Sequence, residues 1–134
     1  MRIIIDTGVL FYPRALRELA EFPDDIILPA VAYAERVRQL CAKGHSADEF
    51  DLWLQRNSID VEAFDRVHAR RVVPRLTSEN AWIRLARDAM IAGHVGSDDV
   101  LWTTNPKDFL AMGLSRSQVW GVAQSPPSPT SRNR

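Results

Sequence analysis

The chain has 134 residues, 46% of them hydrophobic and 25% charged, a composition typical of one globular domain with a single core. Its 17 basic and 17 acidic side chains give a formal net charge of zero, which argues against a broadly basic nucleic-acid-binding protein of the histone type. No apolar run predicts a transmembrane helix or a signal peptide, and the lone Cys41 excludes an intramolecular disulfide, so we expect a cytoplasmic protein.

Short apolar runs alternate with helix-like stretches along the chain. The run Ile3-Ile4-Ile5 is typical of a strand buried on both faces of a parallel sheet. Helix-forming stretches begin near Pro13, Pro29, Ser46 (with Glu49 as its capping-box partner) and Ser78. We therefore expect strands at 3–5, 26–28, 59–61, 100–103 and 119–122, and helices at 13–22, 30–43, 47–56 and 79–95. This alternation predicts an α/β fold with a mostly parallel sheet.

The last ten residues differ from the rest in composition. Residues 125–134 (SPPSPTSRNR) contain three prolines, three serines and no apolar side chain. Such a segment has nothing to bury, so we expect a folded domain at 1–124 followed by a disordered tail at 125–134.

Four acidic residues stand where a parallel α/β sheet binds its ligands, beyond the carboxyl ends of the strands. Asp6 follows the first strand, where its alternative explanation is an N-cap or turn aspartate. Asp108 follows the strand at 100–103, where its alternative explanation is an acid in the first turn of a helix that complements the helix dipole. Glu35 lies on the helix after the second strand, and its alternative interpretation is a solvent-exposed helix glutamate. Asp88 takes a position that the pattern of Ala81, Leu85 and Ala92 assigns to an apolar side chain. Its alternative interpretation is an ion pair with Arg84 on the same helix.

Taken together, the four acids favour a cation site. Several carboxylates at one edge of a sheet repel one another unless a cation neutralises them, and an all-oxygen set suits Mg²⁺ or Mn²⁺ better than zinc. Carboxylate-held divalent metals commonly serve phosphoryl chemistry. The sequence therefore predicts a Mg²⁺ or Mn²⁺ site made by Asp6, Glu35, Asp88 and Asp108.

The stretches IIIDTGVL, AVAYAER, DAMIAGHV and LWTTNPKDF, in this order, resemble the PIN-domain ribonucleases, in particular the VapC-like toxins of type II toxin–antitoxin pairs. The resemblance covers nearly all of residues 1–124 and implies a three-layer α/β/α sandwich. It implies an endoribonuclease that uses the four acids with Mg²⁺ or Mn²⁺ and leaves 5′-phosphate and 3′-hydroxyl ends. Thr7, Thr103 and Asn105 would support the ligands or orient the phosphate, and the partners would be a cognate antitoxin and a second copy in a homodimer.

The chain departs from the family pattern at Gly8, where similar proteins usually carry Asn or Ser. That glycine also argues against a haloacid-dehalogenase-type phosphatase, which needs an Asp at this position. A receiver domain would need an adjacent acidic pair after the first strand, and Ile5-Asp6 supplies no such pair. The remaining alternative is a catalytically weak or inactive PIN-fold scaffold that binds RNA or a protein partner.

The other candidate residues carry weaker signals. His45, His68 and His94 lack metal-ligand spacing and are expected at the surface or at helix ends, whereas Cys41 is expected in the core with Ala34. The segment 66–75 (RVHARRVVPR) is interpreted either as a solvated helix face or as a contact for RNA or an antitoxin.

The arginines change the interpretation of the zero net charge. Setting aside the four site acids leaves 13 acidic against 17 basic residues, 15 of which are Arg, or 17 − 13 = +4. Arginine suits bidentate phosphate contacts, and Arg36, Arg38, Arg84 and Arg87 lie within a turn of Glu35 or Asp88. An acidic pocket within an arginine-rich surface is thus compatible with nucleic acid.

Overall fold

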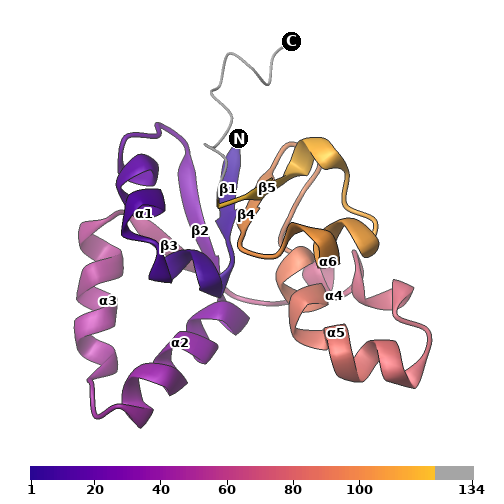
Figure 1. Cartoon of the computed structure of the whole chain (residues 1–134), viewed down its shortest axis with the longest axis horizontal. Coiled ribbons are helices and arrows are strands. Elements are labelled where there is room, and N and C mark those ends of the chain that lie inside the picture. The colour runs from indigo at the N-terminus through magenta and orange to yellow at the C-terminus, as the bar shows by residue number, and fades with distance from the viewer. Residues whose placement is uncertain (123–134) are drawn as a thin grey trace.

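Residues 1–122 are described by a computed structural model, in which five strands form one sheet (Figure 1). The strands are β1 (Arg2–Ile5), β2 (Asp25–Pro29), β3 (Ile59–Glu62), β4 (Val100–Thr103) and β5 (Val119–Gly121). Their order is β3-β2-β1-β4-β5, and every neighbouring pair is parallel. This confirms the predicted α/β class and the parallel sheet. The predicted tail at 125–134 lies outside the described residues.

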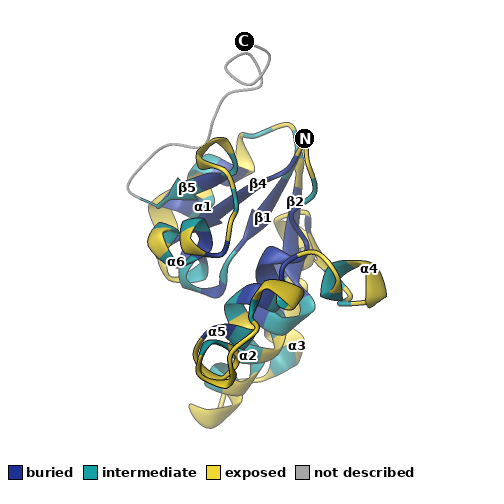
Figure 2. Ribbon diagram, turned by 90° about the vertical axis from the view of Figure 1, so that its right-hand side faces the viewer, coloured by how far each residue is buried: buried dark blue, intermediate teal, exposed yellow. Residues whose placement is uncertain are grey.

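Helices flank the sheet to make a three-layer α/β/α sandwich. Figure 1 shows α1 and α3 on one side of the sheet and α5 and α6 on the other, and Figure 2 shows that the strands between them are largely buried. The α-helices in the described part are α1 (Pro13–Ala20), α2 (Ala30–Ala42), α3 (Ala47–Arg56), α4 (Arg66–Ala69), α5 (Glu79–Ala92) and α6 (Pro106–Ala111), and three short 3-10 helices are η1 (Thr7–Phe11), η2 (Val73–Arg75) and η3 (Arg116–Gln118). Within residues 1–122, no helix combines the length and the apolar character needed to cross a bilayer.

The central position of β1 explains its sequence. Its partners are β2, with Ile3 opposite Ile26, and β4, with Ile3 opposite Val100. Ile3, Ile4 and Ile5 are fully buried because helices cover both faces of the sheet and neighbours cover both edges. Asp6 directly follows this strand, so the first polar side chain after the core lies at the carboxyl edge of the sheet. Figure 1 shows α2 and α5 at that edge, away from the N-terminus.

Two local predictions were wrong. Ala34 and Cys41 on α2 are exposed, and the buried residue of this helix is Ala32, with Val37 half-buried. The small side chains of the predicted stripe define no strong apolar face, so the larger neighbours determine which side packs. Ser46 does cap α3, by accepting a hydrogen bond from the Asp48 amide, but Glu49 makes no reciprocal bond.

Candidate active site

Three of the four predicted acids meet in one pocket at the carboxyl edge of the sheet. The cavity has a volume of about 340 Å³, and Asp6, Glu35 and Asp88 all line it. They come from the residue after β1, from α2 and from α5, respectively, segments far apart in the sequence. The sheet and the α2–α5 contact therefore bring together carboxylates that the sequence only places at separate strand ends and helices.

Asp6 is held by hydrogen bonds to both of its carboxylate oxygens. Oδ1 accepts the Thr7 amide at 2.7 Å, and Oδ2 accepts the Thr103 hydroxyl at 2.8 Å. The same Thr103 hydroxyl accepts the Asn105 amide at 3.0 Å. Thr103 is fully buried at the end of β4, so a rigid strand end fixes the direction in which Asp6 faces the pocket.

The pocket is electrostatically unfavourable for its own acids. Burial raises the pKa of Asp6 above its ordinary value, and the charge of Glu35 raises it further, against the lowering effect of the bonds to Thr103 and Thr7. Burial likewise raises the pKa of Asp88, and the charges of Asp6, Asp108 and Glu35 add to the increase. All four predicted acids thus lie close enough to interact, and a cation would relieve the repulsion.

An arginine of the chain supplies part of that positive charge. Arg87 on α5 forms an ion pair with Glu35, and its Nε lies 3.8 Å from Asp88 Oδ1. Its side chain is 59% exposed, so it reaches into the pocket from the solvent side. In the described part of the chain, no three of the site acids bring their oxygens within 4.8 Å of one another.

Asp108 and the predicted supporting residues have different positions. Asp108 does not line the pocket, but it accepts a 2.7 Å hydrogen bond from the side chain of Asn105, which does line it. Asp108 therefore stands at the pocket border, in the first turn of α6. Thr7 acts through its backbone amide, whereas its buried hydroxyl has no hydrogen-bond partner among the described residues. Of the predicted supporting residues, Thr103 and Asn105 donate side-chain hydrogen bonds to Asp6 and Asp108.

Gly8 lies directly against the side chain of Thr104. A Cβ built on Gly8 would overlap the Thr104 hydroxyl and lie 2.9 Å from its Cγ2. Both residues line the pocket, so the Thr104 side chain fills the space next to Gly8. Sequence reasoning missed this polar group because Thr104 is distant from Gly8 in the chain.

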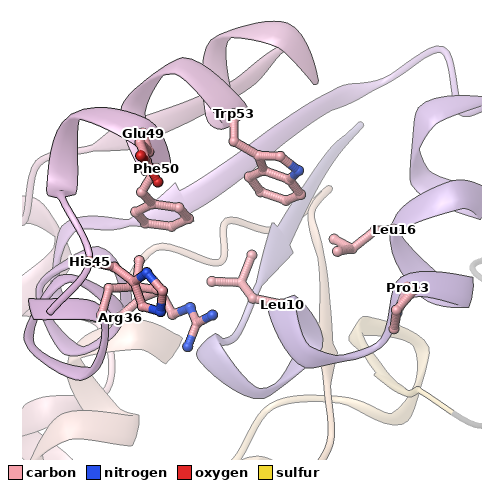
Figure 3. A pocket seen from close by; sticks show the side chains of 9 residues that line it. Leu10, Pro13, Leu16, Arg36, His45, Glu49, Phe50 and Trp53 are labelled. Atoms are coloured by element: carbon pink, nitrogen blue, oxygen red, sulfur yellow. The ribbon is translucent and has the colours of Figure 1, made fainter. Parts of the chain in front are cut away.

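A second cavity lies between α1, α2 and α3 and is mainly apolar (Figure 3). Its volume is about 460 Å³, and Leu10, Phe50 and Trp53 contribute apolar side chains to its lining. Arg36 and His45 add polar atoms at one end. Leu10 belongs to η1, and Thr7, Gly8 and Phe11 of the same short helix line the acidic pocket, so this helix separates the two cavities.

Two of the histidines lie at helix ends, one of the two expected positions, but they belong to a group that the sequence did not predict. His94 is fully buried rather than at the surface, and it lies with His68 and Glu62 in a group in which one side-chain nitrogen or oxygen of each residue lies within 4.8 Å of the other two. No sequence spacing signals this group because its members come from three separate segments.

Two arginines of the basic segment 66–75 help to hold the fold together. Arg71 and Arg75 donate hydrogen bonds to the backbone oxygens of Gly93 and Met112, at 3.1 and 2.7 Å. Its arginines are exposed.

Comparisons with known proteins add no family to this description. No protein-family model matches the chain, and no curated protein does either. The chemistry of the site therefore has to be argued from its geometry: an acidic pocket at the carboxyl edge of a parallel sheet, oriented by Thr103 and partly neutralised by Arg87.

Proposed function

We propose that the protein is a metal-dependent endoribonuclease that hydrolyses RNA phosphodiesters. The observation that carries the proposal is the convergence of Asp6, Glu35 and Asp88 in one pocket, with Asp108 at its border. Carboxylates from four separate segments, with raised pKa values for two of them, are costly for stability. Such arrangements cluster at functional sites.

The donor set fits Mg²⁺ or Mn²⁺. All the candidate ligands are carboxylate oxygens, which these hard cations prefer. The ion pair of Arg87 with Glu35 supports a need for positive charge at this position. A bound divalent ion would supply activation of water and neutralisation of the charge that develops on the phosphate.

The residues around the acids have separable roles in this proposal. Thr103 orients Asp6 through its hydroxyl, and Asn105 orients Asp108 through its side-chain amide. Arg87, whose side chain is 59% exposed and lines the pocket, would be able to pair with a phosphate oxygen of the RNA in place of Glu35. The bidentate geometry of a guanidinium suits that contact.

We also propose that the chain is the cytoplasmic toxin of a toxin–antitoxin pair and forms a homodimer. This follows from the resemblance of its motifs to VapC-like toxins. The apolar cavity between α1, α2 and α3 supports it, since an apolar segment of an antitoxin would fit there. The 72% exposure of Ile83 on α5 is in keeping with a partner surface. Induced expression should arrest growth, and Asp6→Asn should relieve the arrest.

The decisive experiment is RNA cleavage by the purified full chain. A panel of transfer, ribosomal and messenger RNAs is incubated with Mn²⁺, Mg²⁺ or a chelator, and the ends of the products are mapped. We expect metal-dependent cleavage that Asp6→Asn and Asp88→Asn reduce by at least about a hundredfold, because even residues that only support a metal ligand contribute roughly 10–100-fold. Asp60→Asn, at an exposed acid on β3, is the matched control.

Two results would contradict this function. Cleavage that persists in both Asp6→Asn and Asp88→Asn would come from a contaminating nuclease. RNA binding without cleavage, in both metals and across the whole panel, would identify the protein as a PIN-fold scaffold instead. Circular dichroism of each variant shows whether the fold is retained.

A further inference from the structure

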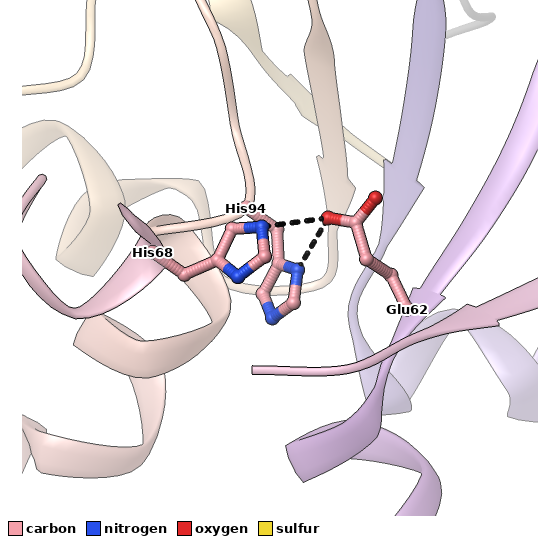
Figure 4. Close-up of side chains that lie close together, drawn as sticks. All are labelled: Glu62, His68 and His94. Atoms are coloured by element: carbon pink, nitrogen blue, oxygen red, sulfur yellow. Dashed lines mark hydrogen bonds and ion pairs between the residues drawn. The ribbon is translucent and has the colours of Figure 1, made fainter. Parts of the chain in front are cut away.

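Glu62, His68 and His94 form a compact group outside the acidic pocket (Figure 4). Glu62 ends β3, His68 lies in α4, and His94 follows the end of α5. One carboxylate oxygen of Glu62 lies 2.7 Å from His94 Nδ1 and 3.1 Å from His68 Nε2. The two imidazole rings stack with centroids 4.1 Å apart and an angle of 20° between their planes. One nitrogen of each histidine is therefore directed at the same carboxylate oxygen, as Figure 4 shows, so the three atoms lie close together.

The burial of the group favours an ion that enters from one side. His94 is fully buried, whereas the side chains of His68 and Glu62 are 12% and 24% exposed. Burial also lowers the pKa of His94, so its imidazole is neutral and available as a ligand at neutral pH.

Neighbouring residues hold each of the three side chains. Arg2 binds the second oxygen of Glu62, Oε2, and leaves Oε1 facing the histidines. Asp65 Oδ1 lies 3.1 Å from His68 Nδ1. The carbonyl of His68 approaches Gly93 so closely that a Cβ there would overlap it, and this close approach brings α4 against the end of α5. A histidine supported by a carboxylate is the usual arrangement around a metal.

We propose that Glu62, His68 and His94 bind Zn²⁺ at a second site, independent of the proposed nuclease site. Two imidazoles and one carboxylate are a common zinc ligand set, whereas Mg²⁺ prefers oxygen ligands alone. The ligand atoms now stand at hydrogen-bond distances, and zinc at 2.0–2.2 Å from each ligand would separate them slightly.

Proton positions are compatible with binding. Without zinc, His68 donates from Nε2 to Glu62 and accepts the Asp65 amide at Nδ1. With zinc, the His68 proton would move to Nδ1, where Asp65 Oδ1 accepts it and replaces the bond from the Asp65 amide, and the His94 proton would move to Nε2, which has no acceptor among the described residues. Each histidine remains neutral, so binding exchanges tautomers without a net loss of protons.

The ion would connect three segments of the fold. It would link the end of β3, the short helix α4 and the connection from α5 to β4. A ligand that binds only the folded state stabilises it, so zinc should raise the melting temperature of the chain. Three protein ligands leave a further coordination position, which a water molecule can fill.

Zinc titration of the chelator-treated full chain tests the proposal. Calorimetry is performed with excess Mg²⁺, which occupies the acidic pocket and leaves the histidines free. We expect one Zn²⁺ per chain and a raised melting temperature, both lost in His68→Gln and Glu62→Gln and retained in His45→Gln, the control at an exposed histidine. Asp65→Asn, which preserves the helix cap, should weaken binding by roughly tenfold because it weakens the support of His68.

The proposal is overturned if the wild-type chain binds no Zn²⁺ in the presence of Mg²⁺, or if folded His68→Gln and Glu62→Gln bind it with unchanged affinity. Cobalt provides an independent readout, since visible absorption bands of bound Co²⁺ report the ligand geometry and should vanish in the same two variants. The RNA-cleavage test of the acidic pocket neither requires nor predicts these results, so the two proposals can fail separately.

Discussion

Replacing Thr103 with valine tests how the strand end of β4 holds the acidic pocket. Valine has nearly the same shape as threonine, so the fully buried side chain leaves no cavity and only the hydroxyl is lost. That hydroxyl donates to Asp6 at 2.8 Å and accepts the Asn105 amide at 3.0 Å. The substitution therefore removes two hydrogen bonds without a change in packing.

The structure gives the size of the expected effect. A hydrogen bond to a charged group contributes about 1.5–3 kcal/mol to the free energy of unfolding, and one between neutral groups about 0.5–1.5 kcal/mol. Asn105 is exposed, so water replaces the bond to its amide and that contribution lies at the low end. We predict that Thr103→Val lowers the free energy of unfolding by about 2–3 kcal/mol at neutral pH.

Urea unfolding at several pH values is the assay. The bond from Thr103 lowers the pKa of Asp6 against the larger raising effect of burial, so its loss raises that pKa further. The added penalty exists only where Asp6 is ionised: it should be complete at neutral pH, shrink as the pH falls through the raised pKa of Asp6, and be gone once the pH reaches the ordinary carboxyl range, near about pH 4. Thr77→Val, at an exposed threonine, is the control and should stay within about 0.5 kcal/mol of wild type.

The reasoning is refuted if Thr103→Val unfolds with the free energy of wild type at neutral pH. It is also refuted if the difference between the two proteins is the same at acid and neutral pH. In the first case water would replace the hydroxyl on Asp6 at no cost, and in the second the bond would not depend on the charge of Asp6.

Three further substitutions test the two sites. Arg87→Gln removes the cation paired with Glu35, so Mn²⁺ should bind more tightly by calorimetry while RNA cleavage falls; unchanged affinity, as expected of the control Arg84→Gln, would contradict this. Because the pKa of Asp88 is raised in the folded state, its ionisation destabilises the fold: Asp88→Asn should be more stable than metal-free wild type in urea at neutral pH, an advantage that disappears in acid, and an advantage independent of pH would contradict the assignment. Gly93→Ala should cost about 1–3 kcal/mol in urea unfolding, because its methyl group would overlap the His68 carbonyl, and a stability equal to wild type would show that α4 shifts freely.

Much of the fold was predictable because local chemistry and global position agree. The run Ile3-Ile4-Ile5 has the composition of a strand buried on both faces, and it is the central strand. Pro13 and Ser78 begin helices as expected, since proline suits a first turn and a serine hydroxyl accepts a free amide. The stripe on α2 failed at Cys41, because that helix has few large apolar side chains and its neighbours α3 and α5 decide which face is covered.

Some residues of the candidate site were also predictable from the sequence, whereas their contacts were not. Asp88 was recognisable because a carboxylate interrupts an apolar helical pattern, and Asp6 because it ends a buried strand. Their convergence, the pairing of Arg87 with Glu35 and the position of Thr104 against Gly8 depend on which elements cross at the sheet edge. No spacing in the sequence encodes these contacts.

The amino-acid sequence by itself determined the class of the fold, its central strand and the residue types at the strand ends, because burial and helix capping act over a few neighbouring residues. The tertiary structure alone decided that Glu62, His68 and His94 meet, since they lie on three segments that only the packing of α4 and α5 against the sheet brings together. It also decided that Asp6, Glu35 and Asp88 share one pocket in a chain of zero net charge, where burial raises the pKa values of Asp6 and Asp88. Contacts of long sequence separation form only when the whole core closes, and local patterns carry no record of them.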